Sequence, residues 1–174
     1  GEGIEPVITG SSYDEASAAA HLDCESSGAV YVHPFDDPRT IAGQGTVAVE
    51  VDEQAPDLDT LVIPVGGGGL AAGVALWFRH HRPEVRLVGA EPAGAASMTA
   101  ALAAGGPVSL DDVDTFVDGA AVGRVGALTY PVVRDLLDEV VRLFPAGGQG
   151  DDSADGAPDV VATDEDGEPL WHPD

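Results

Sequence analysis

The 174-residue chain contains no lysine, and its seven basic residues are all arginine. Set against 31 acidic residues, they leave a formal net charge of −24 at pH 7. A surface of this charge repels nucleic acid and anionic lipid, which excludes both as partners. The acidic residues are spread along the whole chain, so they indicate a solvated surface rather than a binding tail.

The types of acidic and basic residue lead to an expectation about the effect of salt. Asp outnumbers Glu, and lysine is absent. This composition resembles that of proteins from salt-loving archaea, in which high cytoplasmic salt screens the repulsion between like charges. We therefore expect the fold to be lost at low salt.

Cysteine, aromatic residues and long apolar runs are also scarce. Cys24 is the only cysteine, which excludes an intrachain disulfide and is more typical of an inert thiol than of a nucleophile. Aromatic residues make up 5% of the chain, so smaller side chains must fill the core. The absence of a membrane-length apolar run and of a signal-peptide pattern excludes a membrane partner and indicates the cytoplasm. The chain opens on Gly1 without Met, and we expect it to be cut from a longer one.

What is present is an alternation of predicted strands and helices. Strands are expected over residues 4–8, 29–32, 60–65, 85–90, 115–117 and 140–143. Helices are expected over residues 12–24, 40–53, 70–80, 97–104 and from residue 129 onward. The alternation predicts an α/β fold with a parallel sheet covered by helices on both faces. Gly43 and Gly45, inside the second helix, indicate close packing against a neighbour.

Four consecutive glycines follow the apolar run at residues 60–65. The motif is Gly66-Gly67-Gly68-Gly69-Leu70, and a helix is expected directly after it. Glycine amides can close around an anion because no Cβ stands in the way, and a helix N-terminus adds a partial positive charge. Four glycines would also cost considerable entropy in a simple turn. The motif therefore predicts a phosphate-binding loop.

The loop alone leaves the phosphate ligand open. A P-loop is excluded, because Leu70 stands where Gly-Lys-Ser/Thr would be needed. A dinucleotide is an alternative, since Gly66, Gly68 and Ala71 fit the permissive Rossmann glycine pattern. Glu91 ends the next strand, where an acid that binds ribose would lie.

No catalytic constellation accompanies the loop. The five histidines show no metal-ligand spacing with acids or cysteine, and there is no serine nucleophile elbow. Asp36 and Asp37 form either an acid pair or a turn, and Asp-Asp-Pro is typical of a turn. We therefore assign no catalytic residue and no metal ligand.

Five separated motifs narrow the choice of ligand. They are His33-Pro34-Phe35-Asp36-Asp37-Pro38, Ile41-Ala42-Gly43-Gln44-Gly45-Thr46, Val62-Ile63-Pro64-Val65 with the glycines, Glu91-Pro92 before Gly94-Ala95-Ala96-Ser97-Met98, and Asp118-Gly119-Ala120-Ala121-Val122. In this order and spacing the chain resembles threonine ammonia-lyase (threonine dehydratase), of the pyridoxal-phosphate family that includes serine racemase and the tryptophan synthase β chain. The resemblance runs from about Gly3 to Val141.

The resemblance implies a partial tryptophan synthase β-like domain, which is fold type II of the pyridoxal-phosphate enzymes. Residues 1–33 would belong to the small α/β domain and residues 34–144 to the large cofactor-binding domain. Residues 145–174 contain nine acidic residues and no Arg or Lys, and are predicted to be a disordered acidic tail. The implied cofactor is pyridoxal 5′-phosphate, and the implied reaction converts threonine to 2-oxobutanoate and ammonia, with serine giving pyruvate.

The cofactor-binding residues implied by the resemblance are Gly66, Gly67, Gly68, Gly69, Leu70 and Gly119. Amides of the first five would hold the phosphate, the turn at Gly119 would lie beside the pyridine ring, and Phe35 would line the cleft. Related racemases have a metal site whose first acid matches Glu91. Its second acid matches Ser97 here, so no metal is expected.

The missing lysine is central to the resemblance. The family holds its cofactor as a Schiff base on a lysine in a Ser-Phe-Lys motif, which would precede Gly1. The resemblance therefore predicts a truncated, catalytically incompetent chain. Its expected partners are a small amino-acid substrate, threonine or serine, and either a complementing fragment or further copies of the chain. The alternative is a non-catalytic α/β module that binds another phosphate ligand or NAD.

Overall fold

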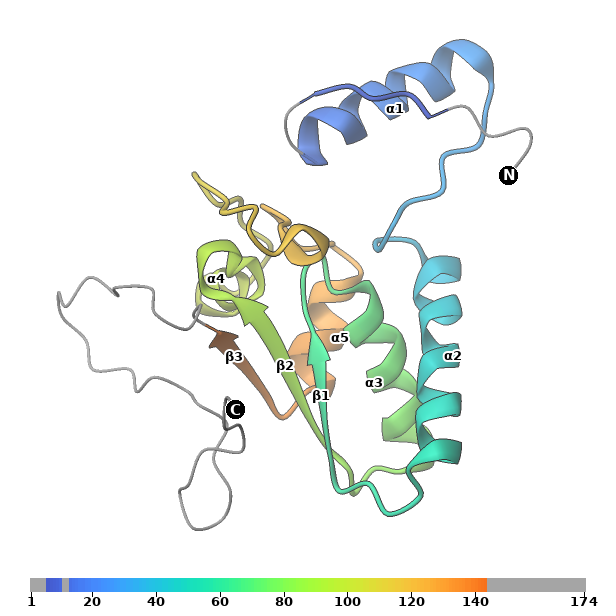
Figure 1. The fold of residues 1–174 in the computed structure, drawn as a ribbon, viewed down its shortest axis with the longest axis vertical. Coiled ribbons are helices and arrows are strands. Elements are labelled where there is room, and N and C mark those ends of the chain that lie inside the picture. The colour runs from blue at the N-terminus through green and yellow to red at the C-terminus, as the bar shows by residue number, and fades with distance from the viewer. Residues whose placement is uncertain (1–5, 11–12, 144–174) are drawn as a thin grey trace, which may run out of the picture.

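The computed structural model describes residues 6–10 and 13–143, which form an α/β fold with one parallel sheet (Figure 1). The helices are α1 (Tyr13–Ser27), α2 (Pro38–Gln54), α3 (Gly69–His81), α4 (Ser97–Ala104) and α5 (Thr129–Leu136). The strands are β1 (Thr60–Pro64), β2 (Arg86–Pro92) and β3 (Glu139–Leu143). Short 3-10 turns are η1 (Ala93–Ala95) and η2 (Asp118–Ala120).

The strands pair in the order β1-β2-β3, and both pairs are parallel, as the sequence predicted. Leu61 lies opposite Leu87, and Gly89 lies opposite Val140. Parallel neighbours need a crossover connection, which α3 provides between β1 and β2, and α4 with α5 between β2 and β3. The carboxyl ends of the three strands therefore meet at one edge of the sheet, and the glycine loop begins there.

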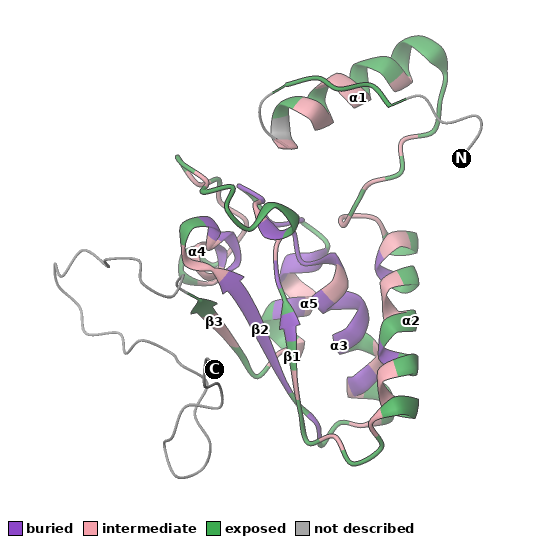
Figure 2. Cartoon of the chain, viewed as in Figure 1, coloured by how far each residue is buried: buried purple, intermediate pink, exposed green. Residues whose placement is uncertain are grey.

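The hydrophobic core lies between the sheet and α3. Val74 and Phe78 of α3 belong to one buried cluster with Leu87 of β2, Met98 of α4 and Val133 of α5. Most of α3 is buried, whereas α1 and α2 are largely exposed (Figure 2). A buried helix of this kind fixes the position of its own N-terminus, which is where the glycines stand.

Helix α2 packs against α3 at a seam that contains glycine. A Cβ on Gly73 would lie 2.7 Å from the backbone nitrogen of Gly45 and closer still to the carbonyl oxygen of Ile41. The expected close packing is therefore found at Gly45. It is not found at Gly43, where an added Cβ would meet nothing within 4 Å.

The opposite face of the sheet is more open. Val62 of β1 is 60% exposed and Leu143 of β3 is 47% exposed. In the described part of the chain, α3 and α5 pack against the face that carries the core, and helical coverage of the opposite face stays a prediction. The sheet and its helices are nevertheless those of the predicted fold class.

Two predicted strands are not formed. Residues 29–32 run without a strand partner, and Val30 is 77% exposed, because β-branched residues form a buried strand only where a neighbouring strand pairs with them. Residue 115 is irregular and residues 116–117 form bends instead, since Asp114 accepts a hydrogen bond from the backbone N–H of Phe116 at 2.9 Å. Of the predicted strand at residues 4–8, residues 6–8 are irregular and the remainder lies outside the described residues.

The other predicted elements match within a few residues. Ser12, the expected start of the first helix, and the predicted tail at residues 145–174 both lie outside the described residues. Cys24 is partly buried on α1. Among the helices that the structure describes, none combines the length and apolarity needed to cross a membrane.

Candidate functional site

The glycine loop continues β1 into the N-terminus of α3. Val65, directly after β1, is still bonded to the sheet, because its N–H donates to the carbonyl of Ala90 at 2.8 Å. Gly68 is the N-cap residue of α3 and has a φ of +92°, a conformation that side chains other than glycine rarely adopt. The first turn of α3 contains no acidic residue. Its unpaired N–H groups and the helix dipole therefore favour an anion at the loop.

Close contact with Phe35 explains two more of the glycines. A Cβ on Gly67 would lie 2.6 Å from Cδ2 of Phe35, and one on Gly69 would lie 2.9 Å from Cα of the same residue. The aromatic ring thus lies directly against the loop. Sequence reasoning predicted glycines for an anion and Phe35 in the cleft, and the packing adds a reason of its own for the lack of side chains.

A cavity of about 650 Å³ opens at this loop. All six predicted cofactor-binding residues line it: Gly66, Gly67, Gly68, Gly69, Leu70 and Gly119. Phe35 also lines it, together with Tyr13 of α1 and Gln44 of α2. The structure therefore brings the predicted site residues together, while their role in binding stays a prediction.

Among the described residues that line the cavity, none is basic. Attraction of an anion must therefore come from backbone amides and from the dipole of α3. The described lining also contains no histidine or cysteine. The loop amides and the dipole of α3 favour an anion in the cavity, although the Asp118 carboxylate also lines it.

The N-terminus of α5 supports the loop from behind. Thr129 is fully buried, and its Oγ1 donates a hydrogen bond to the carbonyl oxygen of Gly67 at 2.6 Å. The backbone N–H of Gly126 donates to the same oxygen at 3.2 Å. Sequence reasoning missed Thr129, although a threonine at the start of a predicted helix is a signal for capping.

The two acids of the Asp-Asp-Pro motif hold two different helices. Asp37 is the N-cap residue of α2 and accepts a hydrogen bond from the N–H of Arg39 at 2.7 Å. Hydrogen bonds from the Arg39 side chain and backbone hold the pKa of Asp37 well below its usual range. Asp36 instead reaches α5, where its Oδ2 accepts from Ala127 N at 2.9 Å and its Oδ1 from Leu128 N at 2.7 Å. Both acids lie in the run of bends at residues 34–37, and the helix-capping roles of Asp37 and Asp36 are new.

Residues 33–36 are fixed by a histidine. Nδ1 of His33 accepts hydrogen bonds from the N–H groups of Phe35 at 3.3 Å and Asp36 at 2.8 Å. The carbonyl of His33 accepts from Oγ1 of Thr40 at 2.8 Å. These bonds place Phe35 over the glycines and aim Asp36 at α5.

Glu91 has a structural partner. It is fully buried, and its Oε2 accepts from Met98 N at 2.9 Å while its Oε1 accepts from Thr99 N at 2.7 Å and from the Thr99 hydroxyl. Both carboxylate oxygens therefore hold the N-terminus of α4. A ribose hydroxyl would have to displace these bonds, which disfavours the dinucleotide alternative. Among described residues, no group of three or more His, Cys, Asp or Glu side chains is arranged to hold a metal.

The chain is similar to known pyridoxal-phosphate enzymes over nearly all of its described length. The family model described as "Pyridoxal-phosphate dependent enzyme" matches residues 1–143. The biosynthetic L-threonine dehydratase IlvA of Corynebacterium glutamicum is 53% identical over 152 residues, which is 85% of this chain and 35% of that protein. The enzyme of the same name from Mycobacterium bovis is 58% identical over 141 residues, 80% of this chain and 33% of that protein.

A solved structure shows the same arrangement. The processed form of threonine deaminase isoform 2 from Solanum lycopersicum superposes with a TM-score of 0.74 at 46% identity, covering 79% of this chain and 40% of that one. The expected fold, type II of the pyridoxal-phosphate enzymes, is thereby confirmed. The chain spans about a third of the length of the curated relatives it matches. From its sequence and its fold alike, the chain belongs to the family of pyridoxal-phosphate-dependent enzymes.

Proposed function

We propose that this chain provides the phosphate-binding part of a pyridoxal-phosphate-dependent threonine or serine ammonia-lyase, which converts threonine to 2-oxobutanoate and ammonia. The observation that carries the proposal is the glycine loop, Gly66–Gly69 with Leu70, which forms a cup at the cavity. Gly66–Gly69 line a cavity at the N-terminus of a buried 13-residue helix, beneath the ring of Phe35. A cup of this kind suits a phosphate monoester, because its amides and the helix dipole supply the charge complement.

Each part of the cup has a distinct task in this proposal. Amides of the four glycines and of Leu70 bind the phosphate. Phe35 excludes water from one side of the loop, and Gly119 leaves room for a flat ring, since an added Cβ there would meet no atom within 4 Å. When bound, pyridoxal phosphate supplies an electron sink for the bond that breaks at the substrate Cα. The residues of this chain bind and orient it.

The base must come from elsewhere, because the sequence contains no lysine. The chain alone is therefore proposed to be catalytically incompetent, and to need a complementing polypeptide that carries the lysine. The small substrate, threonine or serine, would enter the same cavity. A cytoplasmic location and adaptation to high salt belong to the same proposal, on the strength of the composition.

Two paired measurements test the proposal. Pyridoxine 5′-phosphate has no aldehyde, so its binding reports the phosphate cup without amine chemistry. We expect it to bind at least tenfold more tightly than pyridoxine in titration calorimetry, while NAD does not compete. Equal affinity for the two would refute the cup, and competition by NAD would favour the dinucleotide alternative.

The second measurement is formation of 2-oxobutanoate from threonine. We expect none from the chain alone. Activity is expected when the chain is mixed with the preceding segment of the Mycobacterium bovis relative, and a matched segment with its cofactor lysine changed to Ala should restore nothing. Turnover by the chain alone would show that the proposed incompetence is wrong.

A further inference from the structure

We propose that Thr129 and Asp36 are positioning residues for the phosphate cup. They fix the orientation of the Gly67–Gly68 peptide so that the N–H of Gly68 faces the cavity. The inference rests on the proposed function, because it concerns the affinity of the site for phosphate. It assigns to Thr129 and Asp36 the share of that affinity that depends on the backbone N–H of Gly68.

The first step is the carbonyl of Gly67. It accepts two hydrogen bonds from the N-terminal region of α5, from Thr129 Oγ1 at 2.6 Å and from Gly126 N at 3.2 Å. The described chain contains no cis peptide bond, so the Gly67 carbonyl and the Gly68 N–H point in opposite directions. Holding the oxygen against α5 therefore turns the N–H away from α5, on a residue that lines the cavity.

The second step is that the glycine loop needs contacts from elsewhere in the chain to fix the orientation of its peptides. A run of four glycines has no side-chain preference for either orientation of its peptides, and Gly68 already adopts a φ of +92°. Local sequence therefore does not choose between an N–H and a carbonyl facing the cavity. A carbonyl there would repel a phosphate, so the choice bears directly on affinity.

The third step is the contact that fixes the segment containing Gly126 and Thr129. The carboxylate of Asp36 accepts the N–H groups of Ala127 and Leu128, at 2.9 and 2.7 Å. It sits tightly against this segment, since a Cβ on Gly126 would lie 2.6 Å from Cγ of Asp36. Asp36 thus fixes the backbone that carries both donors to Gly67, across a sequence separation of 91 residues to Ala127.

Thr129→Val removes the hydroxyl and keeps the shape, so it is the main test. We expect about a tenfold loss of affinity for pyridoxine 5′-phosphate, the cost of about one hydrogen bond that orders an amide, with pyridoxine binding unchanged. Thr129→Ser retains the hydroxyl and should bind within about twofold of the parent. Asp36→Asn should fall between the two, because the amide keeps one acceptor.

Asp37→Asn is the matched control. It weakens a helix cap of the same kind next in the chain, yet Asp37 does not line the cavity. We expect a lower melting temperature and unchanged phosphate affinity. If Thr129→Val also lowers only the melting temperature, the hydroxyl is merely structural and the proposal is overturned.

A ligand-free measurement separates this inference from the proposed function. In ¹⁵N-glycine-labelled protein, Thr129→Val should shift the amide resonance of Gly68 and leave that of Gly105, on the far end of α4, in place. If the parent protein fails to distinguish pyridoxine 5′-phosphate from pyridoxine, the proposed function fails. The resonances still decide the positioning: a shift at Gly68 supports it, and an unchanged Gly68 overturns it.

Discussion

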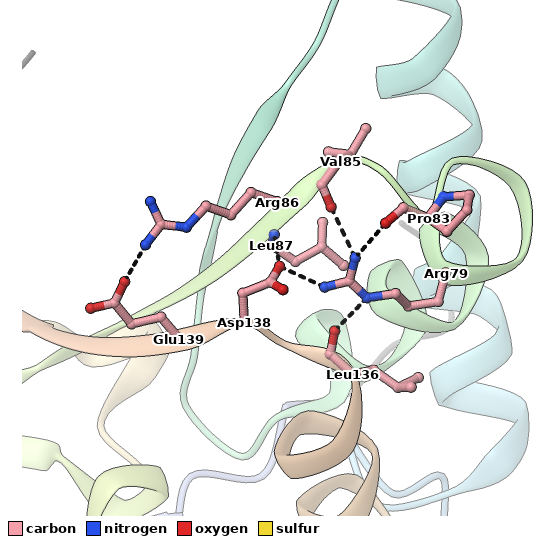
Figure 3. A network of polar contacts seen from close by, with 8 residues as sticks. All are labelled: Arg79, Pro83, Val85, Arg86, Leu87, Leu136, Asp138 and Glu139. Atoms are coloured by element: carbon pink, nitrogen blue, oxygen red, sulfur yellow. Dashed lines mark hydrogen bonds and ion pairs between the residues drawn. The ribbon is translucent and has the colours of Figure 1, made fainter. Parts of the chain in front are cut away.

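Arg79 of α3 donates a hydrogen bond from Nη2 to Oδ2 of Asp138 at 2.6 Å (Figure 3). The same carboxylate oxygen accepts from the backbone N–H of Leu87 at 2.7 Å. Arg79 further donates from Nε to the carbonyl of Leu136 at 2.8 Å and from Nη1 to that of Val85 at 3.0 Å. One side-chain pair thus joins the end of α5 to β2 and α3, where strand β3 begins.

The Arg79–Asp138 pair makes the free energy of unfolding depend on pH. The hydrogen bond from Leu87 N, followed by that from Arg79, lowers the pKa of Asp138 in the folded chain. A lowered folded pKa adds stability above the unfolded value of about 3.9, and this stability is lost as pH falls through the folded pKa. We expect Asp138→Asn to lower the free energy of unfolding by about 1 kcal/mol at pH 7, since the side chain is partly exposed, and to flatten its decline in acid.

Urea unfolding from pH 7 to pH 3 at constant salt measures this effect. Glu139→Gln is the control, because Glu139 of β3 pairs with Arg86 of β2 at 2.6 Å, and Arg86 is 58% exposed whereas Arg79 is 21% exposed. Its removal should change stability by less than about 0.5 kcal/mol. Equal pH profiles for the parent and Asp138→Asn would contradict the assignment.

The glycines at the seam between α2 and α3 predict opposite effects of the same substitution. Gly43→Ala should raise the free energy of unfolding by about 0.5–1 kcal/mol, because alanine favours a helix and the added Cβ has open space. Gly73→Ala should lower it by about 1–3 kcal/mol, because the Cβ meets the backbone of Ile41 and Gly45. Thermal melts of the two variants decide, and similar shifts in both would show that the seam is looser than described.

The cap on α4 should be sensitive to loss of one carboxylate oxygen. Glu91→Gln replaces an acceptor by an NH₂ group that faces a backbone N–H, so we expect a loss of about 1–3 kcal/mol. The exposed Glu50→Gln on α2 serves as the control and should be neutral within about 0.5 kcal/mol. Chemical denaturation is the readout, and a neutral Glu91→Gln would place the carboxylate outside the folding energetics.

Salt should stabilise the fold. At a net charge of −24 the folded chain repels itself, and raising salt from about 0.1 M to about 1 M shortens the screening length from about 10 Å to about 3 Å. We expect the melting temperature measured by circular dichroism to rise with potassium chloride. Asp111→Asn with Asp112→Asn, both exposed, should reduce the slope. A melting temperature independent of salt would rule out the proposed adaptation.

The parts of the fold that sequence predicted are those with local causes. Nearby residues determine each of these parts, which are the apolar run before Gly66, the glycines themselves and the amphipathic or buried helices. The motif order then placed Gly119 and Phe35 at the same cavity, although Gly119 is far along the chain from the loop. These elements carry their own signal, so alternation and motif spacing were sufficient for them.

The parts that sequence missed depend on distant partners. Residues 29–32 have the β-branched composition of a strand, but composition does not say whether a neighbouring strand is present. Asp36 looked like a turn residue because its partners, Ala127 and Leu128, lie more than 90 residues away. The sequence suggested a ribose-binding role for Glu91 as one alternative, since nothing local reveals that it caps α4. The sequence indicates which roles such a side chain could have, and the tertiary contacts determine which of them it has.

Residues 33–37 connect three parts of the site. This one pentapeptide begins α2 through Asp37, covers the glycines with Phe35 and caps α5 through Asp36. Local opening of the peptide would therefore release all three contacts together rather than one at a time. Hydrogen exchange at the first turns of α2 and α5 should accordingly follow a single opening event, and a bound phosphate ester should slow exchange in both helices, although it touches neither of their caps.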